Sequence, residues 1–159
     1  MTSAGSSPDR SGRTAPAGGA HLQFGQPNIF FLTVCTKDRV PWMTQARVQH
    51  SLTVLWRSEA TAWLVGDYLL MPDHVHLFCA PRDWQFGIDE WVRFWKSQFS
   101  RRHMNETWEF QRRSFHHRLR SAEEWSAKWR YVQENPLRAG LMKTDETWPY
   151  CGTVHELRW

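Results

Sequence analysis

Runs of apolar residues along the chain predict several strands. Residues 28–36 (NIFFLTVCT) and 63–71 (WLVGDYLLM) are rich in aromatic and β-branched side chains, which is typical of strands. The Pro-Asp dipeptide that follows the second run is typical of a turn, so residues 74–80 return as the second arm of a tight hairpin. We expect a further short strand over residues 114–119.

Three other segments have the apolar spacing of helices. The first covers residues 44–60, where apolar side chains recur every three to four residues. The second covers residues 89–103 and is expected to have an aromatic stripe and a basic flank: Trp91, Phe94, Trp95 and Phe99 on the stripe, and Arg93, Lys96 and Ser100 on the flank. Ser121, three residues before Glu124, forms a capping box that starts a third helix, which ends before Pro136.

The order of these elements is strand, helix, strand, strand, helix, strand, helix. Antiparallel hairpins with intervening helices favour an α+β fold over a parallel doubly wound sheet. We therefore expect a ferredoxin-like antiparallel sheet with the helices packed on one face. Residues 1–20 have no large apolar side chain after Met1 and are predicted to form a disordered tail, whereas residues 21–159 are predicted to form one domain.

Positive charge is concentrated in the middle of the chain. The whole chain carries a net charge of +4, whereas residues 91–120 alone hold eight basic residues against two acidic ones. The eight are Arg93, Lys96, Arg101, Arg102, Arg112, Arg113, Arg118 and Arg120. Seven aromatic residues lie among them: Trp91, Phe94, Trp95, Phe99, Trp108, Phe110 and Phe115. Such a segment is typical of a nucleic-acid surface, but a solvated helix face beside core aromatic residues explains it equally well.

Other features of the composition exclude several classes of protein. Three cysteines (Cys35, Cys79 and Cys151) lie far apart with no CxxC pair, which argues against a disulfide framework and against a cysteine-based zinc site. No run of about 18 apolar residues predicts a membrane span, and the first residues lack the apolar segment of a signal peptide. We expect a cytoplasmic protein.

His74 and His76 are the first candidates for chemistry. Successive side chains of a strand alternate between its faces, so the two imidazoles point the same way and Val75 points into apolar packing. Neutral imidazole is a common metal ligand, and a pair directly after a turn forms half of a metal site. Two surface histidines on a half-exposed strand explain the same short pattern equally well.

Tyr131 is the second candidate. Trp125, Trp129 and Val132 form the apolar stripe of the third helix, and Tyr131 lies about 200° from Trp129 at about 100° per residue. Tyr131 is therefore expected on the polar face, together with Asn135 one turn later. A tyrosine on a polar face can be offered to a ligand, although exposed surface tyrosines are common.

These candidates together would support phosphodiester chemistry. If His74, His76 and Asn135 hold one divalent ion, that ion polarises a phosphodiester and orients it toward the oxygen of Tyr131. A phenol with its ordinary pKa of about 10 needs positive charge nearby to react as a phenolate. The products are a 5′-phosphotyrosine and a free 3′-hydroxyl. Another 3′-hydroxyl can attack the phosphotyrosine, so nicking and strand transfer are one reaction run twice.

Four blocks in a fixed order resemble the single-tyrosine HUH transposases, and above all the REP-associated tyrosine transposases. The blocks are residues 66–78 (GDYLLMPDHVHLF), 114–120 (SFHHRLR), 131–141 (YVQENPLRAGL) and 148–150 (WPY), within a resemblance over about residues 27–152. The family's Met-Pro-polar-His-hydrophobic-His pattern falls on Met71 to His76. Its catalytic tyrosine, four residues before the Asn of an Asn-Pro motif, falls on Tyr131. Asp73 stands where the family often has Asn.

The resemblance implies a fold, a cofactor and a substrate. The fold is the ferredoxin-like HUH endonuclease fold, the cofactor is Mg²⁺ or Mn²⁺, and the substrate is single-stranded DNA folded into hairpins, such as repetitive extragenic palindromes. An amide on the tyrosine helix completes the metal shell in related transposases, and this position falls on Asn135. The implied enzyme nicks and transfers DNA strands, as a monomer or as a homodimer.

Two other functions remain compatible with the residues. One is a non-catalytic protein that binds DNA or RNA hairpins through the basic segment and uses the histidines only for structure. The other is a different metal enzyme with a His-x-His pair, such as a small β-barrel oxygenase or a hydrolase. The helical patterns around Trp91 and Trp125 disfavour a barrel.

Overall fold

The computed structural model describes residues 22–23, 26–83 and 85–159 of the chain. The tail expected over residues 1–20 lies outside them. The elements are β1 (Leu22–Gln23), β2 (Gln26–Pro27), β3 (Phe30–Thr36), a 3-10 helix (Lys37–Arg39), α1 (Ala46–Ser58), β4 (Trp63–Met71), β5 (His74–Pro81), α2 (Ile88–Arg102), β6 (Phe110–Arg118), α3 (Ala122–Gln133), α4 (Asn135–Arg138) and β7 (Cys151–Thr153). Among these elements, no helix is long and apolar enough to cross a membrane.

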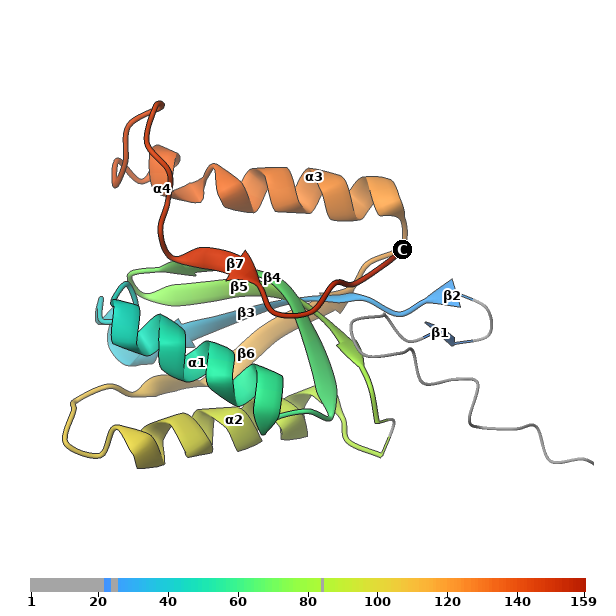
Figure 1. Cartoon of the computed structure of the whole chain (residues 1–159), viewed down its shortest axis with the longest axis horizontal. Coiled ribbons are helices and arrows are strands. Elements are labelled where there is room, and N and C mark those ends of the chain that lie inside the picture. Colours follow the sequence, from blue (N-terminus) through green and yellow to red (C-terminus); the bar gives the residue numbers. More distant parts are fainter. Residues whose placement is uncertain (1–21, 24–25, 84) are drawn as a thin grey trace, which may run out of the picture.

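A five-stranded sheet forms the centre of the fold (Figure 1). Its strands follow the order β6-β3-β5-β4-β7, and every neighbouring pair is antiparallel. The first four strands of this order have the arrangement of a ferredoxin-like sheet, with β3 and β5 in the middle. The predicted α+β, ferredoxin-like class is therefore confirmed. The short strand β7, which pairs with β4 at the sheet edge, is an addition that the apolar pattern did not predict.

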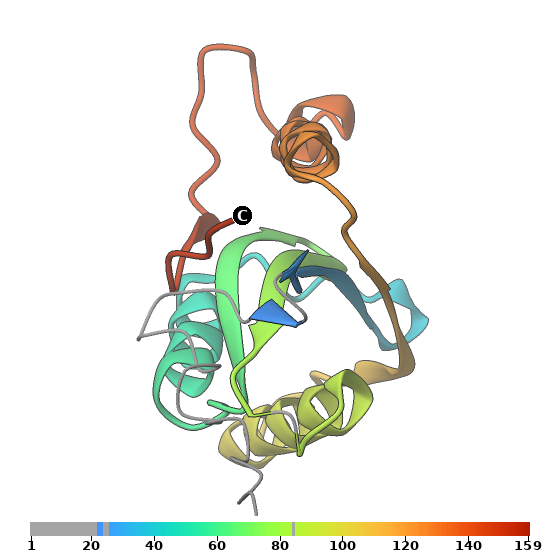
Figure 2. The ribbon, with the colours of Figure 1, turned by 90° about the vertical axis from the view of Figure 1, so that its right-hand side faces the viewer.

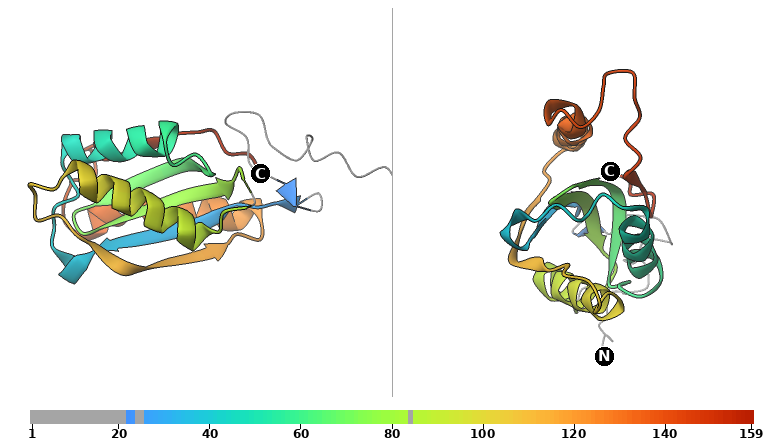
Figure 3. Two further views of the ribbon diagram at one scale, coloured as in Figure 1. Left: turned by 90° about the horizontal axis from the view of Figure 1, so that it is seen from below. Right: turned by 90° about the vertical axis from the view of Figure 1, so that its left-hand side faces the viewer.

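Helices cover both faces of this sheet. Helices α1 and α2 lie side by side on one face, and α3 lies on the other (Figures 2 and 3). The expectation that all helices pack on one face is therefore wrong. The reason is that β5 buries apolar side chains on both of its sides. Val75 and Leu77 join the core under α1 and α2, whereas Phe78 joins the core under α3.

The core under α1 and α2 is rich in aromatic residues. Trp56, Trp95 and Phe99 are fully buried, and the rings of Trp56 and Trp95 meet edge to face with 5.6 Å between their centroids. The indole N–H of Trp91 donates a hydrogen bond to the carbonyl of Ala60 at 2.8 Å. Most of the aromatic residues in the basic segment therefore serve packing.

For two residues of α2, the exposure of the side chain is the reverse of the prediction. Phe94 was expected on the apolar stripe but is 45% exposed, whereas Lys96 was expected on the basic flank but is buried. At about 100° per residue, Lys96 lies on the same helix side as Val92 and Phe99, so its position determines its burial. Its Nζ donates to the carbonyl of Gln111 on β6 at 2.8 Å, and burial lowers its pKa.

Helix α3 begins with the predicted capping box. The hydroxyl of Ser121 accepts the N–H of Glu124 at 3.0 Å, and the Glu124 carboxylate accepts the N–H of Arg120 at 2.7 Å. The helix ends at Gln133, before Pro136 as expected. The short helix α4 follows directly, with Pro136 in its first turn, where a residue without an N–H is tolerated.

Candidate metal and nucleic-acid site

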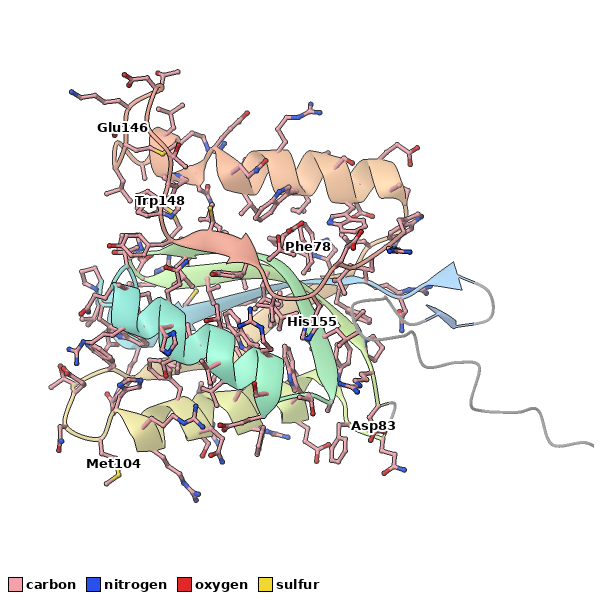
Figure 4. The ribbon with its side chains drawn as sticks, in the orientation of Figure 1. Phe78, Asp83, Met104, Glu146, Trp148 and His155 are labelled. Carbon is pink, nitrogen blue, oxygen red and sulfur yellow. The ribbon has the colours of Figure 1, made fainter. Side chains whose placement is uncertain are left out.

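Strand β5 places His74 and His76 on the sheet face that α3 covers. Their ring centroids lie 4.7 Å apart, so the two imidazoles are neighbours as the alternation of the strand predicts. Phe78, on the same side of β5, packs edge to face on Trp125 and Trp129 of α3 at 5.8 and 5.7 Å between centroids. Figure 4 shows Phe78 between the sheet and α3. The histidine pair thus adjoins the contact between β5 and α3.

Each imidazole is held through its Nδ1 atom. Nδ1 of His74 lies 2.7 Å from a carboxylate oxygen of Asp73, and Nδ1 of His76 lies 2.8 Å from the hydroxyl of Thr33. A proton on Nδ1 that is donated to these oxygens leaves the lone pair of Nε2 for a ligand. Within the described part of the chain, neither Nε2 atom has a hydrogen-bond partner. Histidines that bind metals are typically oriented by such partners, so the pair fits a divalent ion.

The surroundings of the pair keep both imidazoles neutral. Burial lowers the pKa of His74, although the hydrogen bond and charge of Asp73 partly offset it. Burial also lowers the pKa of His76 to about 3, and the positive charges of Lys128 and Arg39 act in the same direction. Burial alone would raise the pKa of Asp73, but His74 and Arg39 outweigh it and the pKa lies below its usual range. Neutral imidazole is the form that binds a metal.

Arg39 is a member of this site that the sequence did not reveal. Its Nε donates to the second carboxylate oxygen of Asp73 at 2.8 Å, and its Nη1 lies 2.8 Å from the sulfur of Cys35. Asp38 and Arg39 both have a positive φ, of 54° and 57°, so the chain turns sharply directly after β3. The negative charge of Asp73 is therefore paired.

Tyr131 lies outside the apolar stripe of α3. Its side chain is 59% exposed, whereas the adjacent Val132 is fully buried. Trp125 and Trp129 pack against the core between α3 and the sheet. The apolar stripe and the polar position of Tyr131 were both predicted from helical spacing, and the structure confirms both.

Phe31 of β3 connects α3 to the histidine pair. Its ring stacks on His76 with 5.2 Å between centroids. Lys128, one turn before Tyr131, places its Nζ 5.2 Å from the centroid of the same ring. The helix that carries Tyr131 therefore passes over His76. Among the described residues, no hydrogen bond joins Tyr131 to either histidine.

Arg138 joins Tyr131 to Asn135. Its guanidinium lies 3.9 Å from the centroid of the Tyr131 ring. Its Nη2 donates to the side-chain oxygen of Asn135 at 2.7 Å and to the carbonyl of Tyr131 at 2.5 Å, and its Nη1 donates to the carboxylate of Glu134 at 3.1 Å. The oxygen predicted as a metal ligand is thus bound to Arg138. The spacing of three residues between Asn135 and Arg138 was the signal in the sequence for this contact.

The described residues contain no group of three or more His, Cys, Asp or Glu side chains placed to hold a metal ion. The candidate ligand set is therefore the histidine pair with an oxygen of another type, such as the amide of Asn135. Arg138 would have to release that amide before it could bind an ion.

The predicted DNA-binding cations do not share one surface. Lys96 is buried, whereas the seven arginines of the set are exposed. Three of them belong to α2, on the sheet face opposite α3: Arg93, Arg101 and Arg102. Three belong to β6 and one follows it: Arg112, Arg113, Arg118 and Arg120. Only the second group belongs to the sheet that carries the histidines.

A cavity of about 680 Å³ opens where the end of β3 meets β6. Its lining includes three basic, two acidic and two aromatic residues, namely Lys37, Arg39, Arg112, Asp38, Glu109, Phe110 and Phe115. Cys35, which lines the cavity too, lies opposite His74 in the pairing of β3 with β5. The cavity therefore adjoins the histidine pair.

No family model and no curated protein matches the chain. Among solved structures, a REP-associated tyrosine transposase bound to a REP hairpin is similar, with a TM-score of 0.62 and 19% sequence identity over 78% of this chain and 75% of that chain. The chain has the fold of this transposase. A protein from Deinococcus radiodurans that is assigned as a transposase has a TM-score of 0.49 and 23% identity, over 67% of this chain and 88% of that chain. The transposase fold agrees with the fold class predicted from the sequence.

Proposed function

We propose that this protein is a tyrosine transposase that nicks and transfers single-stranded DNA. The observation that carries the proposal is that α3, with Tyr131, passes over the sheet face that presents His74 and His76. The fold shared with a REP-associated tyrosine transposase supports it. That relative is bound to a REP hairpin, so we propose hairpins of single-stranded DNA as the substrate class.

His74, His76 and the amide of Asn135 would hold Mg²⁺ or Mn²⁺. When bound, the cation supplies Lewis-acid polarisation of the scissile phosphodiester. Asp73 and Thr33 keep the two imidazoles oriented, and burial keeps them neutral, so that both can act as ligands without first losing a proton. The chain thereby provides a preorganised half-site on a strand of the central sheet.

Tyr131 would act as the nucleophile. Its phenol oxygen forms a bond to phosphorus, and the bond between phosphorus and the 3′-oxygen breaks. The phenol proton passes to solvent, and the released 3′-oxygen takes up a proton to become a 3′-hydroxyl. Arg138 lies on the ring of Tyr131, where its positive charge attracts the incoming phosphate and its contacts restrict the orientation of the ring.

The test is the formation of a covalent adduct. Inverted repeats that flank the coding sequence are made as single-stranded hairpins, labelled at either end and incubated with Mn²⁺ and the wild type or a variant. We expect an SDS-resistant adduct that retains the 3′-end label, and a shorter product that retains the 5′-end label. Tyr131→Phe should abolish the adduct, whereas the control Tyr150→Phe, a change outside α3 and α4, should not. Absence of the adduct from the wild type with every such hairpin would refute the proposal.

A second candidate function is hairpin binding without cleavage. It is favoured by one observation, that Arg138 covers the ring of Tyr131 and binds the oxygen of Asn135. In that case the wild type and Tyr131→Phe bind the same hairpin with equal affinity and neither forms an adduct. The adduct assay combined with a binding measurement distinguishes the two functions.

A further inference from the structure

The sheet face that carries the histidine pair also carries a phenylalanine. Thr33 of β3 lies opposite His76 of β5 on one side and opposite Phe115 of β6 on the other. Residues that are directly paired across antiparallel strands point to the same face of the sheet. The hydroxyl of Thr33 contacts His76, so Phe115 shares the face of His76. Two strand spacings separate them, or about 10 Å between their backbones.

Phe115 is unusual among the aromatic residues of the basic segment because its ring is exposed. Four of the seven are buried in the core under α1 and α2, and a fifth is partly buried there: Trp91, Trp95, Phe99, Trp108 and Phe110. The two that remain are Phe94, 45% exposed on α2, and Phe115, 59% exposed on β6. Of these two, only Phe115 belongs to the face of the histidine pair. Both residues are exposed phenylalanines, and they differ in the face of the sheet on which they lie.

Basic residues lie near the exposed ring. Arg113, two residues earlier in the irregular part of β6, is exposed and has no ion-pair partner among the described residues. Arg112 and Phe115 line the cavity that adjoins the histidine pair. Arg39 and Lys37 line it too, and they are paired with Asp73 and Glu109. In the described sheet, β6 is an edge strand, so no other strand pairs with its outer side there. An open aromatic ring among cations is typical of a surface for single strands, where bases stack and phosphates are neutralised.

We propose that Phe115 is a stacking platform for an unpaired base of the DNA strand that reaches the histidine pair. The inference rests on the proposed function and assigns a nucleotide subsite on β6, about 10 Å from His76. Arg113 and Arg112 neutralise the phosphates on either side of that base. Stacking tolerates every base because each has a π-face, so this subsite holds the strand in place and does not read its sequence.

The experiment uses a DNA hairpin with a single-stranded extension in which 2-aminopurine replaces one base at a time. Fluorescence is recorded without added metal, so that binding is measured apart from cleavage. We expect the wild type to change the fluorescence of 2-aminopurine strongly at one position. Phe115→Ala and Phe115→Leu should abolish that signal and weaken binding by about 5- to 150-fold, whereas Phe115→Trp should retain both.

Phe94→Ala is the matched control, because it removes an exposed phenylalanine on the other side of the sheet and should leave binding unchanged. Thermal unfolding verifies that the variants are folded, and Phe115→Leu retains an apolar side chain without a π-face. The inference is overturned if the wild type forms the adduct but Phe115→Leu binds and quenches as the wild type does. If the wild type neither binds the hairpins nor forms the adduct, the proposed function is refuted, and the inference about Phe115 is refuted together with it.

Discussion

The hydrogen bond between Thr33 and His76 permits a small change beside the candidate metal site. The hydroxyl of Thr33 lies 2.8 Å from Nδ1 of His76. Thr33→Val replaces this hydroxyl with a methyl group of similar size on a central strand, where valine is well accommodated. The substitution should therefore leave the fold intact and remove the group that orients His76.

Loss of a hydrogen-bond partner of a metal-binding histidine typically weakens metal affinity by about 10- to 100-fold. This corresponds to about 1.4–2.8 kcal/mol of binding free energy. His76 is half-buried, so its Nδ1 would also lose its partner in a partly desolvated place. We expect the free energy of unfolding to fall by about 1–3 kcal/mol as well.

Titration calorimetry with Mn²⁺ measures the affinity, and urea denaturation measures the stability. The control is Thr53→Val, which removes a hydroxyl that bonds the carbonyl of His50 within the exposed part of α1. This control should leave Mn²⁺ affinity unchanged. Equal Mn²⁺ affinity of the wild type and Thr33→Val would refute the reasoning, because the hydroxyl would then not orient a metal ligand.

Two further predictions concern Arg138 and pH. Arg138→Gln should slow adduct formation by about tenfold or more with little change in hairpin affinity, because it removes the contact shared by Tyr131 and Asn135. Single-turnover kinetics measure this, and an unchanged rate would contradict it. Below about pH 6.5 the unfolded chain binds a proton that folded His76, with a pKa of about 3, does not, so stability falls as pH falls. Between about pH 7 and pH 5 His76 contributes up to about 2 kcal/mol of this loss, measured by urea denaturation. His76→Gln should reduce the slope, and a full slope in that variant would show that other groups cause it.

The sequence by itself determined most of the secondary structure and half of the candidate site. The run of residues 63–71 was predicted as a strand with the bounds that β4 has, and the capping box at Ser121 placed the start of α3. These features depend on neighbours within one element, which the alternation of a strand or the first turn of a helix sets directly. For the same reason the adjacency of His74 and His76 could be predicted without a structure.

The tertiary structure alone decided which of these elements face one another. The position of Phe115 beside the histidine pair depends on the register of β6 with β3 and of β3 with β5, and His76 itself lies 43 residues after its partner Thr33. No local period encodes a pairing over that separation. The placement of α3 opposite α1 and α2 has the same cause, because it follows from apolar burial on both sides of β5.

Lys96 and Arg138 show the same limit at single residues. The assignment of helical stripes predicted an exposed cation at position 96, but the packing of α2 buries this position and β6 supplies the carbonyl that satisfies it. Arg138 reaches back over the helix break at Glu134 to Tyr131, a contact that requires the relative placement of α3 and α4. The chain thus determined which residues are suited to the chemistry, and long-range packing decided which of them meet.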